Sequence, residues 1–249
     1  MKQNKIELKK NSIAIVGWHD GSAGQIDAWF EKSKEYDVVC FINPNDRPLD
    51  IYPKKIQRDA SQFSYPTKTT LKGKPLINSL RWDNVIKKHG IEKVLVTTDD
   101  MHDRYSQIIQ AKKAGLKLIN AIHPTACIME GAILKENIIL YPKAYVGYRA
   151  ELFTGAIMNT GSQIDHHCVL KECATIDPGV VFASNVTVGK FTRVHTGAIC
   201  KNRIRMGENS VIGAGSVIIE DVPDNVTVVG VPGKIIKRSA AIKLRQKPF

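Results

Sequence analysis

Long hydrophobic runs are absent from this 249-residue sequence. The longest apolar stretches, such as residues 13–16, are far too short to span a bilayer. The amino terminus is basic, with Lys2, Lys5, Lys9 and Lys10, but no apolar signal-peptide segment follows it. We therefore expect neither a signal peptide nor membrane insertion.

Acidic residues and cysteines are also few. The 24 Asp and Glu residues are outnumbered by 36 Lys and Arg residues, which gives a net charge of +12. This excess favours a polyanionic small ligand, such as a nucleotide or coenzyme A, and we expect no nucleic-acid partner because no recognition motif accompanies the charge. Five cysteines, an odd number, favour reduced thiols in a cytoplasmic protein over a disulfide framework.

The second half lacks the turn signals, spaced about 8–12 residues apart, that antiparallel strands require. It has instead a strict six-residue period of apolar residues, which chance would produce on the order of 10⁻⁶ of the time. Helical faces repeat every 3.6 residues, so a helix is excluded. The series is Ile122, Ile128, Leu134, Leu140, Val146, Leu152, Met158, Ile164, Leu170, Ile176, Phe182, Val188, Val194, Cys200, Met206, Ile212 and Ile218.

The residue two places before each of these is usually small. The small residues are Ala126, Ala132, Ala144, Ala150, Ala156, Ser162, Cys168, Ala174, Thr192, Ala198, Ser210 and Ser216. This pattern predicts a solenoid of short strands, in which the large residue points to the axis and the small one fills a tight corner. Three strands make a triangular coil of about 18 residues, so residues 122–218 form slightly more than five coils. No insertion breaks the register, and any active surface is expected on the coil faces and on neighbouring chains.

The first half alternates between strand and helix patterns. Strands are expected at residues 12–17, 37–43, 93–98 and 117–120, and helices at 22–34, 79–89 and 102–114. This alternation predicts a small parallel α/β sheet with helices on both faces. Pro124 places the junction near residue 121. We therefore divide the chain into residues 1–121, a solenoid over 122–232, and a basic tail over 233–249 that we expect to form a short surface helix.

Three stretches connect this organisation to a known family. They are residues 159–169 (Asn-Thr-Gly-Ser-Gln-Ile-Asp-His-His-Cys-Val), 122–126 (Ile-His-Pro-Thr-Ala) and 230–234 (Gly-Val-Pro-Gly-Lys). Together with the two-domain layout, they resemble the bacterial nucleotide-sugar N-acetyltransferases of the left-handed β-helix superfamily, the sialic-acid and bacillosamine type. The resemblance covers nearly the whole chain.

The resemblance implies a Rossmann-like nucleotide-sugar-binding domain followed by a left-handed parallel β-helix that carries the acyltransferase activity. It also implies acetyl-CoA as donor, a 4-amino-sugar nucleotide as acceptor, no metal, and a homotrimer with active sites between adjacent solenoids. The setting would be cytoplasmic synthesis of bacterial surface glycans, whether lipopolysaccharide, capsule or glycoprotein glycan.

The resemblance assigns catalysis to His166, the general base of the family at this position. His166 lies two places after inward-pointing Ile164, so its side chain should leave the coil near a corner. Imidazole titrates near neutral pH and can take the proton that an amino-sugar nitrogen sheds as it attacks a thioester. His167 stands where the family usually has Glu or Asp, so Asp165 or another chain would have to supply the carboxylate, or His167 itself would accept a hydrogen bond. Asn159 matches a family position near the sugar and the base.

The same resemblance indicates a coenzyme site held mainly by backbone groups. Ser184 lies one coil beyond His166, and its amide matches the position that meets the thioester oxygen. Other matching contact positions are Thr175, Thr196, Ala214 and Pro232. Lys234, with Lys237 and Arg238, is a candidate for the coenzyme phosphates. Plain coil packing, or a solvated basic tail, is the alternative interpretation of these residues.

The sugar nucleotide is expected at the first domain, where residues 17–24 follow a strand and open a helix in a phosphate-cradling context. The candidates there are Gly17, His19, Gly21 and Ser22. Asn43 and Asp46 end the second strand, where a ribose or base would lie, and Asp100 and Arg104 follow the third strand at the carboxyl edge. Loop and helix capping is the alternative role for these residues.

The histidine spacing disfavours one other function, and two alternatives stay open. A metal-dependent hydratase on the same solenoid needs three converging histidines, and His166, His167 and His195 lack that spacing. A non-catalytic sugar-nucleotide-binding scaffold and an O-acetyl- or other acyltransferase are the remaining alternatives. The sequence leaves open which sugar is used, whether the nucleotide is UDP, GDP or CMP, and whether the acyl group is acetyl or longer.

Overall fold

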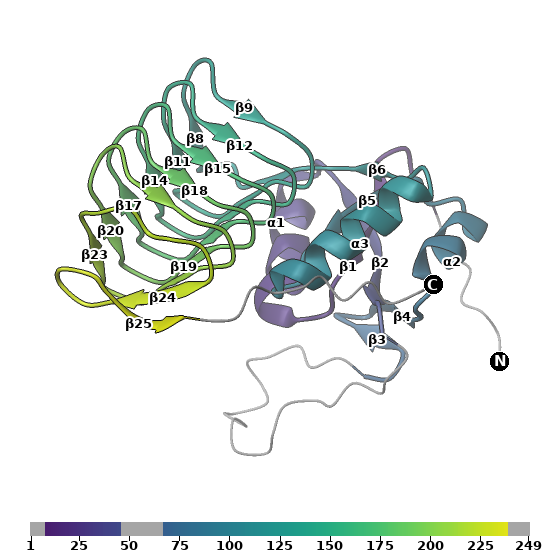
Figure 1. Cartoon of the computed structure of the whole chain (residues 1–249). Helices are drawn as coiled ribbons and strands as arrows, with labels where there is room; N and C mark the ends of the chain where they lie inside the picture. Colours follow the sequence, from purple (N-terminus) through teal and green to yellow (C-terminus); the bar gives the residue numbers. More distant parts are fainter. Residues whose placement is uncertain (1–7, 46–66, 239–249) are drawn as a thin grey trace, which may run out of the picture. The chain divides into compact units, whose positions relative to one another are not determined.

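The computed structural model describes residues 8–45 and 67–238 (Figure 1). The chain divides into two compact units between Ala121 and Ile122. Among the helices in the described ranges, none combines the length and the apolar character needed to cross a bilayer.

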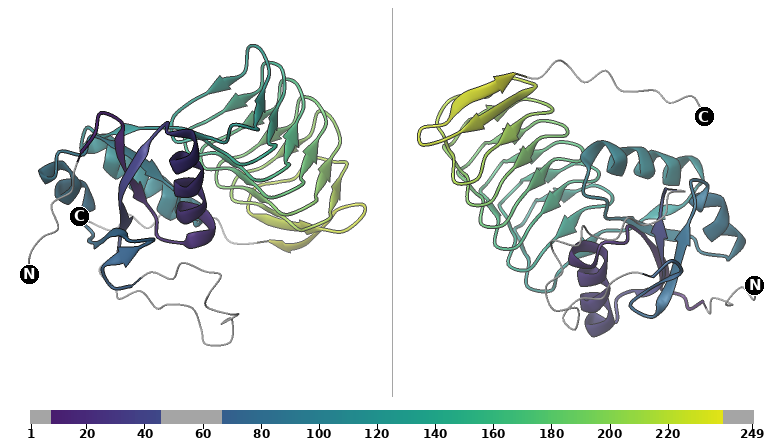
Figure 2. Two further views of the ribbon diagram at one scale, coloured as in Figure 1. Left: turned by 180° about the vertical axis from the view of Figure 1, so that it is seen from behind. Right: turned by 90° about the horizontal axis from the view of Figure 1, so that it is seen from below.

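The first unit is a mainly parallel α/β sheet with the strand order β3-β4-β2-β1-β5-β6. Among the strands that the structure describes in this unit, only β3 runs antiparallel to its neighbour, β4. The strands are β1 Ser12–Val16, β2 Asp37–Asn43, β3 Thr70–Leu71, β4 Lys74–Asn78, β5 Lys93–Val96 and β6 Lys117–Leu118. The helices are α1 Gln25–Ser33, α2 Trp82–Lys88 and α3 Met101–Lys113. The helix α3 lies in front of the strands in Figure 1, and the view from behind in Figure 2 shows α1 on the opposite face.

The hairpin β3–β4 was not predicted from the sequence. Lys72 and Gly73 form its tight turn, and both have positive φ. A turn of this kind usually begins with Asn, Asp or Gly, so a lysine at its first position signals the hairpin only weakly in the sequence. A tertiary contact holds the turn, because the fully buried carboxylate of Asp27 on α1 pairs with the ammonium groups of Lys72 and Lys74. Such long-range pairing cannot be read from local composition.

The second unit is a stack of two-residue strands, each ending on one residue of the six-residue series. These strands are β7 Ala121–Ile122, β8 Cys127–Ile128, β9 Ile133–Leu134, β10 Ile139–Leu140, β11 Tyr145–Val146, β12 Glu151–Leu152, β13 Ile157–Met158, β14 Gln163–Ile164, β15 Val169–Leu170, β16 Thr175–Ile176, β17 Val181–Phe182, β18 Thr187–Val188, β19 Arg193–Val194, β20 Ile199–Cys200, β21 Arg205–Met206, β22 Val211–Ile212 and β23 Val217–Ile218. Every third strand pairs in parallel with an 18-residue offset, as Tyr145 does with Gln163 and Gln163 with Val181.

The strands form three sheets that fit a left-handed β-helix. The first sheet contains β7, β10, β13, β16, β19, β22, β24 (Val226–Val229) and β25 (Lys234–Arg238). The second sheet contains β8, β11, β14, β17, β20 and β23, and the third β9, β12, β15, β18 and β21. The predicted period and coil length are therefore confirmed. The expectation of a parallel α/β sheet in the first half is confirmed as well.

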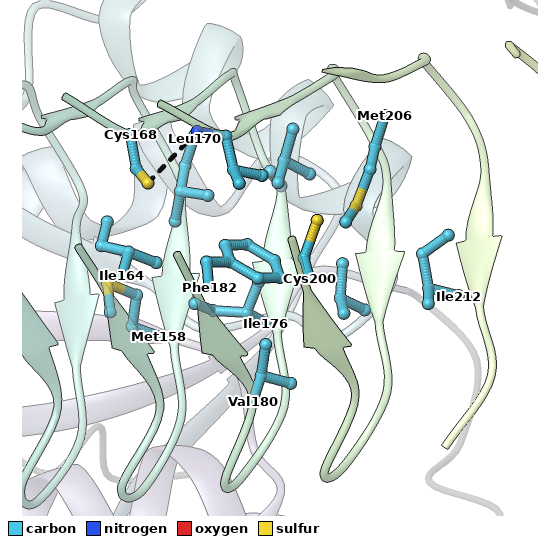
Figure 3. Packing of buried hydrophobic residues seen from close by; sticks show 14 of the residues in the cluster. Met158, Ile164, Cys168, Leu170, Ile176, Val180, Phe182, Cys200, Met206 and Ile212 are labelled. Atoms are coloured by element: carbon cyan, nitrogen blue, oxygen red, sulfur yellow. Dashed lines mark hydrogen bonds between the residues drawn. The ribbon is translucent and has the colours of Figure 1, made fainter. Parts of the chain in front are cut away.

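The axis of the coils is a continuous apolar column. From Leu140 onward, the residues of the six-residue series are at most 2% exposed. Figure 3 shows Ile164, Phe182 and Cys200, one coil apart, following one another inside the column. Burial raises the pKa of the Cys200 thiol to about 12, and the five cysteines, all within the described residues, form no disulfide. The prediction of reduced thiols is consistent with this packing.

The tail begins differently from the expectation. Instead of a surface helix, residues Lys234–Arg238 form the strand β25, which pairs antiparallel with β24, Val226–Val229. The edge of β24 has backbone groups that the last coil leaves without a parallel neighbour, so pairing with β25 satisfies them. The prediction of a helix was wrong for these five residues, and residues 239–249 lie outside the described residues.

The column makes a testable prediction about stability. Ile164 and Ile128 occupy the same position in the second sheet, but Ile164 is fully buried and Ile128, in the first coil, is 38% exposed. We expect Ile164→Ala to lower the free energy of unfolding by about 2–5 kcal/mol, the usual cost of such a cavity. Ile128→Ala should cost less than half as much. Urea unfolding followed by circular dichroism compares the two variants, and equal losses would show that the column does not carry the stability.

Candidate functional site

Two edges of the coil collect the polar residues that the sequence singled out. We call the turns from the second to the third sheet the His166 corner, residues 147–149, 165–167, 183–185 and 201–203. We call the turns from the first to the second sheet the Asn159 corner, residues 159–161, 177–179, 195–197 and 213–215. Within each corner, equivalent residues are 18 apart and lie on neighbouring coils.

At the His166 corner, two exposed imidazoles contact each other. The Nδ1 atoms of His166 and His167 are 2.9 Å apart, and the rings stand perpendicular with centroids 5.1 Å apart. Asp165 does not orient either ring, because its Oδ1 accepts from the backbone N–H of His166 at 2.7 Å. Asp165 therefore does not take the place of the family's acidic residue. The side chain that contacts the His166 ring is His167.

This contact can be made with either ring as the donor. A hydrogen bond between two Nδ1 atoms needs one nitrogen to donate and the other to accept. When His166 donates, its Nε2 keeps a lone pair and can take a proton, and the resulting imidazolium still donates to neutral His167.

The neighbouring coil positions this pair. His167 has a left-handed backbone with φ of 59°, and its N–H donates to the carbonyl of Tyr148 at 2.9 Å. The Tyr148 ring lies against the His167 ring at 6.0 Å between centroids, and Arg149 stacks on Tyr148 at 5.0 Å. Gly147 is required beneath them, since a Cβ there would lie 2.7 Å from the backbone nitrogen of His166.

A groove and a backbone donor lie beside the pair. The groove, about 360 Å³, runs over the second sheet and is lined by Tyr145, Gln163, Asp165, Val181, Phe182, Ala183, Ile199 and Cys200.

Ser184 is half-buried one coil from His166, about 4.8 Å along the axis. Within the described part of the chain, the Ser184 N–H donates no hydrogen bond, while its carbonyl accepts from Arg203. An N–H at this place is available to a ligand oxygen.

At the Asn159 corner, a buried carboxylate organises three side chains. Asp177 is only 5% exposed. Its Oδ2 accepts from His195 Nδ1 at 2.9 Å and from Arg193 Nε at 3.1 Å. Its Oδ1 accepts from Arg193 Nη2 at 3.2 Å and from Asn159 Nδ2 at 3.3 Å. These four contacts fix the orientation of the Asn159 amide and the His195 ring.

The remaining coenzyme candidates are spread over the second unit. Thr196 and Ala214 are exposed at the Asn159 corner, whereas Thr175 is buried on β16. Pro232 and Lys234 are exposed, the latter on β25. The candidates thus form two groups on different edges, with His166, His167 and Ser184 at one corner and Asn159, Thr196 and Ala214 at the other.

In the first unit, the turn after β1 is folded around His19. The backbone N–H of Gly21 donates to His19 Nδ1, and the N–H groups of Ser22 and Gly24 donate to the His19 carbonyl. A π-helical turn, Asp20–Gly24, therefore precedes α1. Gly17 has φ of +143°, and a Cβ there would lie 2.1 Å from Thr97 Oγ1, so only glycine fits. Three amides of the expected phosphate cradle are used inside the turn.

The other candidates at the sheet edge are engaged with their own chain. Asn43 is buried and donates to Asn78 Oδ1 at 2.9 Å. Asp100 is the N-cap of α3 and accepts from the N–H groups of His102 and Asp103. Arg104 is fully buried and donates to the carbonyls of Thr98 and Asp99. Asp46 lies outside the described residues.

Sequence reasoning missed several of these residues. Asp177, Arg193, Tyr148 and Arg149 were not considered, and His195 was weighed only as a metal ligand. The signal that finds Tyr148, Asp177 and His195 is the coil period itself, because they lie 18 or 36 residues from His166 or Asn159. Among residues 8–45 and 67–238, no three His, Cys, Asp or Glu side chains are grouped to hold a metal ion.

Comparison with known proteins gives relatives of two kinds. No family model matches the sequence. The chain is 36% identical over 121 residues to a serine acetyltransferase of Synechococcus elongatus, which covers 47% of this chain and 43% of that protein. The chain thus spans less than half the length of the curated relatives it matches first.

Solved structures match over nearly the whole chain. PerB from Caulobacter crescentus, in complex with CoA and GDP-perosamine, is 24% identical with a TM-score of 0.78, covering 93% of this chain and 100% of that one. The acetyltransferase domain of PglB from Neisseria gonorrhoeae, in complex with acetyl coenzyme A, is 25% identical with a TM-score of 0.77, covering 92% and 100%. The resemblance read from the sequence is therefore confirmed: the chain is similar over nearly its whole length to the β-helix nucleotide-sugar N-acetyltransferases.

Proposed function

We propose that the protein transfers an acetyl group from acetyl-CoA to the amino group of a nucleotide-linked amino sugar. The observation that carries this proposal is the match along 92% of this chain to the acetyltransferase domain of PglB, which was solved with acetyl coenzyme A. PerB, of the same fold, was solved with CoA and GDP-perosamine. We place the reaction in the synthesis of bacterial surface glycans in the cytoplasm, with no metal required.

In this proposal, His166 is the general base of a direct transfer. The sugar nitrogen attacks the thioester carbonyl carbon and loses its proton to His166 Nε2 as the carbon–nitrogen bond forms. The carbon–sulfur bond then breaks, and the sulfur of coenzyme A leaves as a thiol after taking the proton that His166 accepted. The 2.9 Å contact with His167 is compatible with this role, because His166 Nε2 can accept a proton when His166 Nδ1 is the donor of the pair. His167 replaces the acidic partner of the family as a neutral acceptor.

The developing oxyanion is assigned to the Ser184 N–H. This donor lies one coil from His166 and makes no hydrogen bond within the described chain. A backbone N–H already aimed outward stabilises developing charge without reorganising at the moment of reaction. The groove on the second sheet, bordered by Asp165 and Ala183 next to this site, would receive one of the two substrates.

We assign nucleotide-sugar binding to the first unit as a Rossmann-like domain. Its parallel strands β1, β2 and β5 end at one edge, where ligands bind in open α/β sheets. The residues proposed there are Gly17, His19, Gly21, Ser22, Asn43, Asp46, Asp100 and Arg104; of these, Arg104 is fully buried and would hold the edge in place without touching the ligand. Because the turn amides are used by His19, the turn would contact the nucleotide through the exposed His19 ring and the glycine backbone.

The two groups of candidates support a site shared between subunits. The His166 and Asn159 corners border opposite edges of the second sheet, and the five residues from Gly161 to Asp165, four steps of about 3.3 Å, span about 13 Å of extended chain. If a second copy of the chain packs against this sheet, the Asn159 corner of the second copy can approach the His166 corner of the first copy. We therefore propose a homotrimer.

A hydroxyl acceptor is the second candidate function. It is favoured by the sequence matches to serine acetyltransferases and by a galactoside O-acetyltransferase of Escherichia coli, 34% identical over 59 residues. A turnover screen with acetyl-CoA, using amino-sugar nucleotides alongside serine and simple galactosides, separates the two functions. Transfer to a hydroxyl alone would replace the amino-sugar proposal.

Substitution of the base tests the mechanism. His166→Ala should lower turnover by about 10²–10⁴-fold, the usual contribution of a positioned general base. The affinity for coenzyme A should barely change, because His166 acts on the acceptor. His167→Asp, which restores an acceptor at the partner position, should keep most of the activity, whereas His167→Leu should lose part of it. Steady-state kinetics and calorimetry of coenzyme A binding measure these effects.

The opposite result has a clear meaning. If His167→Leu abolishes turnover while His166→Ala retains it, the roles of the two adjacent histidines are exchanged. Normal turnover in both variants would remove this pair from the reaction altogether.

The proposed assembly predicts a solution mass of about 83 kDa, three times the chain mass of 27.7 kDa. Light scattering at micromolar protein concentration measures this mass directly. A stable and active monomer would show that one chain builds the site by itself.

The proposed division of labour predicts the behaviour of a fragment. Residues 122–249 should fold alone, since each coil contacts chiefly its neighbours, and should bind coenzyme A with nearly unchanged affinity. The same fragment should lose useful affinity for the sugar nucleotide. Calorimetry with both ligands tests this, and tight binding of the sugar nucleotide to the fragment would contradict the assignment of the first unit.

A further inference from the structure

The edge of the first sheet where its parallel strands begin carries a dense group of lysines that the proposed function does not use. The helices that connect these strands run back along the sheet, so they end at the same edge. We call residues 8–11, 32–37, 86–93 and 111–117 together the lysine edge. It has three acidic residues, no arginine and ten lysines, namely Lys9, Lys10, Lys32, Lys34, Lys87, Lys88, Lys93, Lys112, Lys113 and Lys117.

Contacts between the four segments show that they form one continuous surface. Asn11 Nδ2 donates to the carbonyl of Lys34 at 3.3 Å, which joins the first segment to the second. Lys93 Nζ donates to the carbonyl of Lys10 at 3.0 Å, which joins the first segment to the third. The parallel pairing of β5 with β6 joins the third segment to the fourth. The positive charges are therefore gathered on one side of the first unit.

Helix stability accounts for only part of this charge. Lysines in the last turn of a helix offset the negative end of the helix dipole, which explains the lysine pairs that end α2 and α3. Lys10 and Lys117 lie at strand starts instead, and both are exposed. Sheets have only small dipoles, so a strand start does not attract a cation. The excess of lysines therefore points to an anionic partner.

The chemistry of the lysine edge selects among anionic partners. Arginine, whose guanidinium forms paired and directed bonds to phosphate, is the preferred residue where nucleic acids are recognised. The lysine edge has only ammonium groups, which are point charges on flexible stems. Its residues, all of which the structure describes, include no exposed aromatic ring on which a base could stack. Flexible point charges fit a fluid array of anionic headgroups better than the fixed phosphates of a nucleic acid.

We propose that the lysine edge binds the surface of a membrane that contains anionic phospholipids. Each lysine held near such a surface raises the affinity about fivefold, so several lysines together give stable attachment. Leu8, beside Lys9 and Lys10, is 42% exposed and offers an apolar side chain to the headgroup region. The contact is peripheral, because it uses side chains at one edge of a folded unit.

Attachment by this edge leaves the proposed nucleotide site open. The strands run from the lysine edge toward the opposite edge, and β1 alone, with five residues, spans about 13 Å. Gly17 follows β1 and Asn43 ends β2 at that opposite edge. Membrane binding should therefore leave turnover unchanged. The inference goes beyond the proposed function and does not depend on it, since lipid binding needs only the lysine edge.

The experiment measures how the full-length protein sediments with phospholipid vesicles. At about 0.1 M salt, the protein should sediment with phosphatidylcholine vesicles that contain about one-third phosphatidylglycerol, and not with phosphatidylcholine alone. About 0.5 M salt should release it, because the screening length then falls to about 4 Å. Absence of binding to the anionic vesicles, or equal binding to both kinds of vesicle, would overturn the inference.

A triple variant locates the binding surface. Lys10, Lys88 and Lys117 are exposed and come from three of the four segments. Replacing all three by Gln should lower the affinity for the anionic vesicles about a hundredfold, at about fivefold for each lysine. Melting temperatures are recorded, and if the triple variant does not fold, the three single variants decide the question, each with a loss of about fivefold.

A matched control removes the same charge elsewhere. Lys68, Lys143 and Lys201 are also exposed and lie outside the lysine edge. Replacing these three by Gln should leave the affinity for the vesicles nearly unchanged. Equal losses in the two triple variants would show that the net charge of +12, and not the lysine edge, attracts the vesicles.

Two further measurements separate this inference from its alternatives. If duplex DNA binds the wild-type protein more tightly than the vesicles do, and the lysine-edge variant loses that binding, the partner is a nucleic acid and the membrane inference is wrong. Acetyl transfer is measured on the same preparations. Active protein that does not bind vesicles overturns only this inference, whereas inactive protein that binds them through the lysine edge overturns only the proposed function.

Discussion

The structure depends on one constraint, the parallel hydrogen-bond ladder that links each strand to the strand 18 residues later. Because the ladder tolerates no slip, the residue at each position of one coil lies directly on its equivalents in the next. The axis fills with one apolar residue per strand, and the corners close on small residues such as Ala150, Ser162 and Ala174. An insertion in a strand would shift every later side chain to the wrong face.

The same constraint builds the polar sites. The coil carrying Gly147 and Tyr148 lies against the turn that carries His166 and His167, so the packing beneath the imidazole pair is set by residues 18 positions earlier. Beside His166 the turn carries His167 in place of an acidic residue, and the two Nδ1 atoms are 2.9 Å apart. A neutral acceptor stabilises an imidazolium less than a carboxylate does. His167 can accept from His166 only in the tautomer that leaves the Nδ1 of His167 without a hydrogen.

The two corners use different chemistry. At the His166 corner the imidazoles are exposed and bonded to each other. At the Asn159 corner a nearly buried carboxylate holds an arginine, a histidine and an amide in fixed orientations. Removing Asp177 would leave the Arg193 fork without its anion, so the cluster also ties neighbouring coils together. Rigid orientation suits binding, and an exposed, reversible proton acceptor suits proton transfer.

The sequence by itself determined the solenoid, its 18-residue coil, the boundary near residue 121 and the parallel α/β sheet, because a six-residue period and a strand–helix alternation are local patterns. It also placed His166 and Ser184 at a corner, since one period fixes where every residue lies. Tertiary structure alone decided the β3–β4 hairpin held by Asp27 and the strand at residues 234–238. It also decided that the turn amides bond to His19 and that Arg193 and His195 both donate to Asp177. These features depend on which side chains meet across coils and elements, and a hydrogen bond between distant residues leaves no periodic trace in a single sequence.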